Sequence, residues 1–269
     1  MGKSPFHFSF PTHLPNTKMS GKTDPMVQEI MGLHKAGDYS TIIERLQEVI
    51  HCDERNKIHL LHLLSWPTPT EEALASLAAD IYSLRISHIY SICCGTGLLE
   101  WLLSQFLLKH YKESDIDYSK RIELTGVEID FRWWNSSYAP PSFIPLQFVG
   151  KDFAVENPFG EFDDMVMFCY FSSVPKLLGY LKAFLGSYVL IIGPIMTPSQ
   201  YYVSNNNDDE FADVELTEIF KLPKSDWKLI ILKQFGSVKT DHMAIYRRVE
   251  KTFAPSNNKR KSSRMQCAI

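Results

Sequence analysis

Hydrophobic and polar positions change their period along the chain, and from about residue 86 onward strand patterns alternate with helix patterns. Apolar residues three and four positions apart predict helices within 97–111 and 174–186. Short apolar stretches rich in β-branched and aromatic residues predict strands within 88–95, 121–130, 145–153, 162–171, 187–194, 227–237 and 242–250. This alternation predicts an α/β fold, with a mostly parallel sheet, crossover helices and an antiparallel strand pair at one edge.

Helical patterns come before the first strand. Asp24 and Pro25 are typical of an N-cap and a first helical residue, so they predict a helix up to residue 36. A second helix is predicted within 37–51 and a third, shorter one within 56–64. These segments indicate a helical extension in front of the α/β core.

The helix just before the first strand has the clearest N-terminal signal. The sequence predicts Thr68 as its N-cap, Pro69 as its first residue, and Glu71 as the residue that closes a capping box. One face of this helix is apolar, as packing on a core requires. That face consists of Leu74, Leu77, Ala78, Ile81 and Leu84.

The pattern divides the chain into four parts. Residues 1–23 lack periodicity and predict a flexible arm, 24–85 form the helical extension, 86–253 form the α/β domain, and 254–269 predict a flexible basic tail. The polar loop 194–214 follows the fifth predicted strand, where it is either a lid or a disordered insertion.

Composition and charge narrow the class of protein. The 269 residues include 28 Lys and Arg against 31 Asp and Glu, a net charge of -3 that gives no indication of nucleic acid or an acidic membrane as a partner. No apolar run is long enough for a signal peptide or a membrane span, which predicts a cytoplasmic or nuclear protein. The cysteines have neither metal-ligand spacing nor a disulfide pattern, so no metal is predicted: Cys52, Cys93, Cys94, Cys169 and Cys267.

Residues suited to ligand binding gather where predicted strands end, which is where open parallel sheets bind ligands. Gly95 and Gly97 end the first strand and begin a helix, so the backbone there can turn sharply and approach a ligand. Glu128 ends the second strand, and its carboxylate can accept hydrogen bonds from two ribose hydroxyls. Further along the chain, the same edge receives Asp152 and Phe153 after the third strand, and Cys169 and Tyr170 at the end of the fourth.

This ordered set resembles the class I S-adenosylmethionine-dependent methyltransferases over roughly residues 86–250. The matching pieces are "SICCGTG", "LTGVEID", "FVGKDF" and "FDDMVMFCYF", and the closing strands around "HMAIYRR" also suit the family. The resemblance implies a three-layer sandwich that binds S-adenosylmethionine or S-adenosylhomocysteine and transfers a methyl group to an unknown acceptor.

The resemblance also implies roles for individual residues. Gly95 and Gly97 would line the methionine and ribose, Glu128 would hold the ribose, and Asp152 would hold the adenine with Phe153 beside the ring. The implied cofactor set is completed by residues on the first and fourth strands: Ser91, Cys93, Cys169 and Tyr170.

The sequence departs from the family pattern at three places. Family members usually carry an acid at the position of Ser91, where it helps to bind the cofactor's ammonium group, and a glycine at the position of Cys93. The fourth strand also lacks the Asn-Pro-Pro or Asp-Pro-Pro motif of members that methylate amino groups. No catalytic residue is therefore assigned.

Two other functions stay open. A catalytically inactive scaffold of the same fold could bind a protein partner through the N-terminal helices or the loop with Trp133 and Trp134, which could also wall the adenine or plug the sheet. A dinucleotide-dependent oxidoreductase is disfavoured, because Glu100 stands where the third glycine of that fingerprint is needed. Asp241 and His242 precede the last strand, and nothing in the sequence places them near Cys169.

Overall fold

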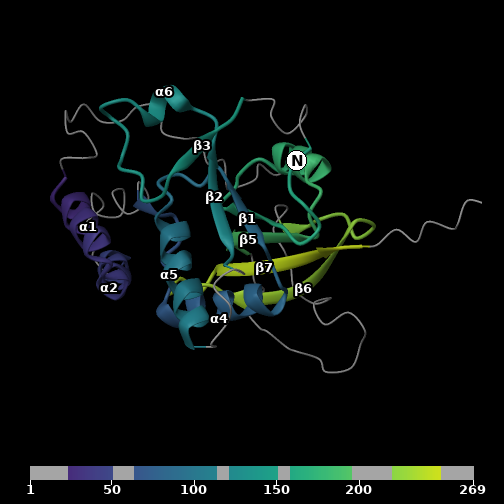
Figure 1. Cartoon of the computed structure of the whole chain (residues 1–269), viewed down its shortest axis with the longest axis horizontal. Helices are drawn as coiled ribbons and strands as arrows, with labels where there is room; N and C mark the ends of the chain where they lie inside the picture. Colours follow the sequence, from purple (N-terminus) through teal and green to yellow (C-terminus); the bar gives the residue numbers. More distant parts are fainter. Residues whose placement is uncertain (1–23, 51–63, 114–120, 151–157, 196–219, 250–269) are drawn as a thin grey trace, which may run out of the picture.

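The computed structural model describes residues 24–50, 64–113, 121–150, 158–195 and 220–249 (Figure 1). In these residues, seven strands form one sheet in the order β3-β2-β1-β4-β5-β7-β6. The strands are β1 (His88–Ile92), β2 (Glu123–Glu128), β3 (Leu146–Phe148), β4 (Met165–Cys169), β5 (Tyr188–Pro194), β6 (Trp227–Gln234) and β7 (Asp241–Arg248). The helices are α1 (Pro25–Ala36), α2 (Tyr39–Ile50), α4 (Glu71–Ser83), α5 (Leu98–Glu113), α6 (Phe131–Trp134) and α8 (Val174–Ala183).

The sheet has the predicted mixture of strand directions. The β1 strand pairs in parallel with β2 and β4, β2 pairs in parallel with β3, and β4 pairs in parallel with β5. Only β7 is antiparallel to both of its partners, β5 and β6, so the antiparallel pair occupies one edge of the sheet. The strand order reverses between β1 and β4, which is where an open α/β sheet forms its ligand crevice.

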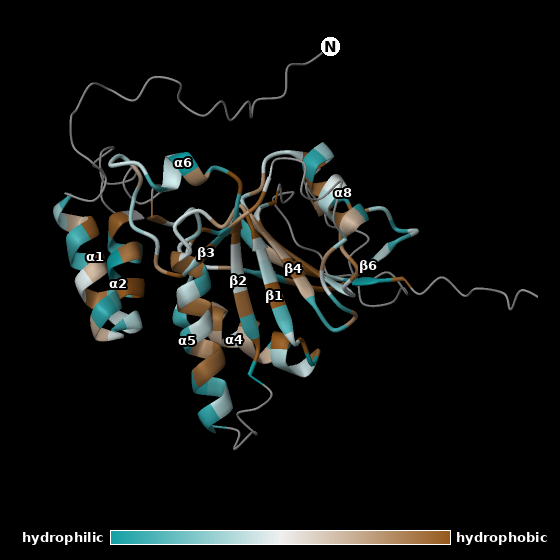
Figure 2. Cartoon of the chain, turned by 45° about the horizontal axis from the view of Figure 1, so that its top comes forward, coloured by the Kyte–Doolittle hydropathy of each residue, from teal (hydrophilic) through white to brown (hydrophobic). Residues whose placement is uncertain are grey.

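Helices cover both faces of the sheet and make three layers. Figure 2 shows α4 and α5 beside one face, with α1 and α2 outside them, and α8 at the other face. Because successive side chains of a strand point to opposite faces of the sheet, each face has its own hydrophobic core. Ile89, Met165 and Met243 belong to the core beneath α4 and α5, whereas Ile92 and Val166 belong to the core beneath α8.

The predicted N-terminal helices are present, and their buried side chains join the same core as α4 and α5. Asp24 caps α1 by accepting a hydrogen bond from the Met26 amide (2.8 Å), as the Asp-Pro signal predicts. Val27 and Ile30 from α1 and Ile42 from α2 are buried in that core. Of the third predicted segment, only Leu64 lies within the described residues.

The predicted start of α4 was wrong by two residues. Thr70 is the N-cap, with its side chain accepting from the Ala73 amide (3.1 Å), and the helix begins at Glu71. Thr68 is instead tied to the β6–β7 turn, because its carbonyl accepts from the Ser237 amide (3.1 Å). The predicted apolar face is buried at Leu74, Leu77, Ala78 and Ile81.

One element was not expected from the sequence. The stretch after β2 contains the short helix α6, whose first turn is capped by the Asp130 side chain on the Trp133 amide (2.9 Å). Figure 1 shows α6 above the ends of β2 and β3. The predicted arm, the basic tail and most of the 194–214 loop lie outside the described residues.

Candidate functional site

The turn between β1 and α5 has the geometry expected of its glycines. Gly95 and Gly97 have φ values of 65° and 74°, in the left-handed region that favours glycine. A Cβ on Gly95 would meet no atom within 4 Å, so this part of the turn is open to a ligand. A Cβ on Gly97 would lie 2.3 Å from Cγ1 of Ile144, because the segment after α6 packs closely on the turn. Gly95 therefore leaves the turn open to a ligand, whereas Gly97 allows Ile144 to pack closely on the turn.

The Glu128 carboxylate lies beside the open side of this turn. Its Oε1 accepts a hydrogen bond from the Gly95 amide (2.7 Å), and the Trp134 side chain also hydrogen-bonds the carboxylate. Burial raises the pKa of Glu128, while these hydrogen bonds act in the opposite direction. The predicted neighbours Gly95 and Glu128 are therefore in direct contact, although 33 positions separate them in the sequence.

A second carboxylate lies under the turn and was missed as a site residue. Glu100, in the first turn of α5, is only 1% exposed, and its Oε1 accepts a hydrogen bond from the Ser91 hydroxyl (2.6 Å). Its Oε2 has no hydrogen-bond partner among the described residues. Glu100 was detectable in the sequence, because it is the only charged residue between positions 97 and 108 of an apolar helix. It places an acid next to Ser91, where the family resemblance expects one.

Burial raises the pKa of Glu100 to about 7, so part of its population is protonated at neutral pH. Its ordinary value is 4.5, and the folded state therefore holds this proton more tightly than the unfolded state. A pKa raised in this way costs stability as the pH rises from 4.5 to about 7, with a full cost of about 3 kcal/mol.

Glu100→Gln removes this pH-dependent cost, because an amide needs no ionisation and can still accept the Ser91 hydrogen bond. We expect the variant to be more stable than the wild type by about 3 kcal/mol at pH 8 and by much less at pH 4.5. Urea unfolding of both proteins at the two pH values checks this. If the two proteins differed in stability by the same amount at both pH values, the stability difference would not come from the raised pKa of Glu100.

Cys93 occupies a conformation that usually belongs to glycine. Its φ is 55°, and its side chain packs toward the core beneath α8. Burial and the nearby Glu128 carboxylate raise the pKa of the Cys93 thiol to about 12, and burial also raises that of Cys94. Both thiols are free, not bonded to each other, and only partly buried.

A third carboxylate of the site, that of Asp241, is hydrogen-bonded to the residue that follows β4. Tyr170 has a φ of 50°, and its hydroxyl donates to Oδ1 of Asp241 at the start of β7 (2.7 Å). Asp241 is 1% exposed, and its Oδ2 has no partner among the described residues. Burial raises the pKa of the Cys169 thiol, and the Glu100 and Asp241 carboxylates raise this pKa further. Sequence reasoning named Cys169 and Tyr170 but did not place Asp241 beside them.

Left-handed backbone in non-glycine residues is concentrated at this edge. Among the described residues, Arg85, Cys93 and Tyr170 have a positive φ, and the last two follow directly on β1 and β4. Such conformations cost about 1–2 kcal/mol each, and they cluster at functional sites. The strained residues Cys93 and Tyr170 therefore lie at the same edge of the sheet as the buried acids.

The aromatic loop after β2 does not form the buried plug that was one alternative. Phe131, Trp133 and Tyr138 are exposed, whereas Trp134 contacts Glu128. Asp152 and Phe153, the predicted adenine contacts, lie outside the described residues.

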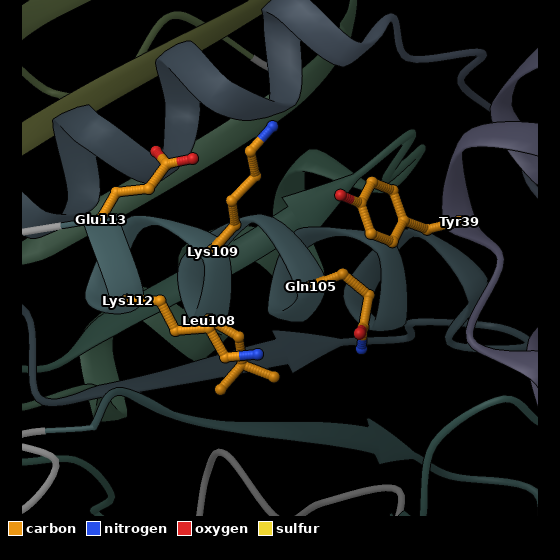
Figure 3. Close-up of a pocket in the computed structure, with 6 residues that line it drawn as sticks. All are labelled: Tyr39, Gln105, Leu108, Lys109, Lys112 and Glu113. Atoms are coloured by element: carbon orange, nitrogen blue, oxygen red, sulfur yellow. The ribbon is translucent and has the colours of Figure 1, made fainter.

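A pocket with a volume of about 320 Å³ lies elsewhere on the molecule, and its lining residues are drawn in Figure 3. Its lining comes from the C-terminal half of α5 and from Tyr39 at the start of α2: Tyr39, Gln105, Leu108, Lys109, Lys112 and Glu113. Because the glycine turn joins the opposite end of α5, this pocket is separate from the candidate site.

In the described part of the chain, none of the helices is both long and apolar enough to cross a membrane.

Comparisons with known proteins find only distant similarities in structure. No protein-family model matches the sequence, and no curated protein does. Similar solved structures include the 16S rRNA methylase ArmA (15% identity over 83% of this chain and 98% of that chain, TM-score 0.41). Another is a putative O-methyltransferase from Klebsiella pneumoniae (12% identity, 84% and 90%, TM-score 0.41). A third is magnesium protoporphyrin IX methyltransferase from Synechocystis with bound SAH (11% identity, 83% and 99%, TM-score 0.39).

Likenesses at these TM-scores carry no argument about function. The fold rests on the chain's own topology, in which a parallel β3-β2-β1-β4-β5 array is completed by the antiparallel β7 and by β6. With a glycine turn after β1 and an acid at the end of β2, this chain has the class I methyltransferase fold.

Proposed function

We propose that this protein binds S-adenosylmethionine at the β1–α5 turn and transfers its methyl group to an acceptor. The observation that carries the proposal is the pair of buried carboxylates, Glu128 and Glu100, on an open glycine turn at the switch point of the sheet. Oε2 of Glu100 has no partner among the described residues, and the Glu128 carboxylate, beside the open turn, has the capacity to accept further hydrogen bonds. When bound, the cofactor supplies a methyl group on a positively charged sulfur, which is activated for attack by a nucleophile.

Glu128 is the proposed ribose contact. The Gly95 amide fixes one of its oxygens at 2.7 Å, which orients the carboxylate at the end of β2. A carboxylate held in this way can accept hydrogen bonds from the two neighbouring hydroxyls of a ribose. Because Gly95 has open space where a Cβ would be, the ligand backbone can approach the turn closely.

Glu100 is the proposed contact for the cofactor's ammonium group, in place of the acid missing at Ser91. Its Oε1 is held by the Ser91 hydroxyl, and its buried Oε2 accepts no hydrogen bond from any residue that the structure describes. Leaving such an oxygen without a partner costs free energy, and an ammonium group would remove that cost. The change at Ser91 is therefore compensated by an acid from α5.

Titration calorimetry with S-adenosylhomocysteine tests the proposal. We expect wild-type binding with a dissociation constant on the order of micromolar, weakened at least about 10-fold by Glu128→Gln, because charge-assisted hydrogen bonds are lost. Glu123→Gln is the matched control, since Glu123 is an exposed acid at the other end of the same strand. The absence of binding at millimolar ligand by folded wild-type protein would refute the proposal and favour the scaffold alternative.

A further inference from the structure

The N-terminal helical extension is connected to the glycine turn through His34 of α1. This residue lies in the last turn of α1, whose end is fixed by the left-handed C-cap Gly37 (φ 74°). Its Nε2 hydrogen-bonds the carbonyl oxygen of Phe143 (3.0 Å), 109 positions later in the chain. Because a carbonyl only accepts, the imidazole nitrogen is the donor. Figure 1 shows that the segment leading from α6 to β3, which contains Phe143, passes between α1 and α5.

Phe143 connects His34 to the middle of the glycine turn. The backbone amide of Phe143 donates to the carbonyl of Thr96 (2.8 Å), which is the residue between Gly95 and Gly97. Phe143 is 5% exposed and Thr96 is 3% exposed, so this hydrogen bond lies in the interior of the protein. The side chain of His34 is therefore two hydrogen bonds away from the turn.

The imidazole of His34 also packs against the start of α5. Its ring centroid lies 4.6 Å from that of Trp101 and 5.2 Å from that of Phe143, both in edge-to-face contact. The Trp101 amide donates to the Gly97 carbonyl (2.9 Å), so the backbone of this tryptophan is bonded to the turn as well. His34 thus contacts two aromatic residues whose backbones are each hydrogen-bonded to the glycine turn.

The position of this turn determines the geometry of the proposed ligand contacts. The Gly95 amide orients the Glu128 carboxylate at 2.7 Å. The segment after α6 packs so closely on the turn that a Cβ on Gly97 would lie 2.3 Å from Cγ1 of Ile144. Groups packed at this density transmit displacements to one another. A shift of the segment that His34 holds would therefore also move the amide that orients the carboxylate.

We propose that His34 is a positioning residue of the cofactor site. By holding the segment after α6 against the glycine turn, it keeps Gly95 and Glu128 in the geometry that binds the adenosyl part of the cofactor. It acts through Phe143 and Thr96, and not by a contact of its own with the ligand. This inference rests on the proposed function, and it assigns α1 a part in cofactor binding.

Two substitutions of His34 separate its hydrogen bond from its packing. His34→Phe keeps an aromatic ring beside Trp101 and Phe143 but removes the donor, whereas His34→Gln carries an N–H donor at a similar reach. We expect S-adenosylhomocysteine to bind His34→Phe about 5-fold more weakly than the wild type, as one lost hydrogen bond predicts, and His34→Gln within about 2-fold of the wild type. Titration calorimetry measures these affinities. His34→Leu, which also lacks a donor, replaces His34→Phe in the comparison if the latter does not fold.

Tyr39→Leu is the matched control for a general loss of stability. Tyr39 also belongs to the helical extension, but it contacts Phe106 in the middle of α5 (centroids 5.3 Å apart), away from the turn. We expect this variant to melt at a lower temperature and to bind S-adenosylhomocysteine as the wild type does. The NMR chemical shift of the Gly95 amide is a second readout that needs no ligand. It should change in His34→Phe, return toward the wild-type value in His34→Gln, and stay unchanged in Tyr39→Leu.

The outcomes distinguish this inference from the proposed function. Wild-type affinity in His34→Phe, an equal loss of affinity in Tyr39→Leu, or a loss that His34→Gln does not restore would overturn the positioning role and leave the proposed function intact. If folded wild-type protein does not bind S-adenosylhomocysteine at millimolar concentration, the proposed function itself is overturned. The role of His34 in cofactor binding would then be overturned with it, even if the Gly95 amide responds to the substitutions.

Discussion

Gly97→Ala is expected to lower the free energy of unfolding by about 3 kcal/mol, whereas Gly95→Ala lowers it by only about 1 kcal/mol. Both glycines have a left-handed φ, so both substitutions introduce similar backbone strain. Only at Gly97 would the added methyl meet the Ile144 side chain, with its Cγ1 at 2.3 Å. The difference between the two variants therefore isolates the packing cost at the base of the turn.

Urea unfolding of the two variants and the wild type measures this difference. A third variant with both Gly97→Ala and Ile144→Ala is compared with Ile144→Ala alone. Removing the obstructing side chain should reduce the effect of Gly97→Ala toward that of Gly95→Ala, as expected for residues in direct contact. Equal costs for Gly95→Ala and Gly97→Ala would mean that Ile144 does not press on the turn.

Glu100→Gln is expected to weaken S-adenosylhomocysteine binding by about 10- to 100-fold, the range expected when a charged hydrogen bond to a buried carboxylate is lost. The same variant should bind 5′-methylthioadenosine as the wild type does, because that ligand has the adenosyl part but no ammonium group. Glu128→Gln should weaken the binding of both ligands, since both contain the ribose that Glu128 is proposed to contact. Calorimetry with the two ligands thus separates the two acids.

The affinity of the wild type for S-adenosylhomocysteine should also depend on pH. Glu100 has a pKa of about 7 without ligand, and only its ionised form attracts an ammonium group strongly. Affinity should therefore rise as the pH increases from 5.5 to 7.5, and Glu100→Gln should remove this rise. A pH profile that is the same in both proteins would exclude Glu100 as the ammonium contact.

The same buried acid links stability with binding. An ionised Glu100 costs stability in the free protein, and the proposed ammonium contact would offset that cost in the complex. Glu100→Gln is accordingly expected to stabilise the free protein at pH 8 and to weaken the binding of S-adenosylhomocysteine. A group that reduces stability and improves function is typical of binding sites, because binding sites retain polar groups that the fold alone would replace.

Local patterns were sufficient to predict most secondary structure. Asp24 and Pro25 start α1, and the predicted strands and helices of the α/β core are present, although α5 extends two residues beyond its predicted range and β7 begins one residue before its own. Errors occurred where a tertiary contact competed with a local signal. Thr68 has the residue type of an N-cap, but its carbonyl serves the β6–β7 turn, so Thr70 caps α4 instead.

The glycine turn and the acid of β2 could also be predicted, because their spacing follows the order of strands in a parallel sheet. Gly95 and Glu128 end neighbouring strands, and the structure joins them by a hydrogen bond of 2.7 Å. The departure at Ser91 suggested a lost acid, since a linear motif compares only positions in the chain. In the structure, Ser91 donates to Glu100, a residue nine positions later on the helix that packs over the strand.

The sequence by itself determined the α/β fold, the sheet with its antiparallel pair, and the edge at which a ligand would bind. These follow from the period of apolar residues and from strand-end chemistry, which are local properties. Only the tertiary structure decided that Glu100 stands beside Ser91, and that Trp66 and Asp241 meet at Tyr170. Asp241 lies 71 positions from Tyr170, and contacts across such separations depend on strand order and helix packing rather than on any pattern along the chain.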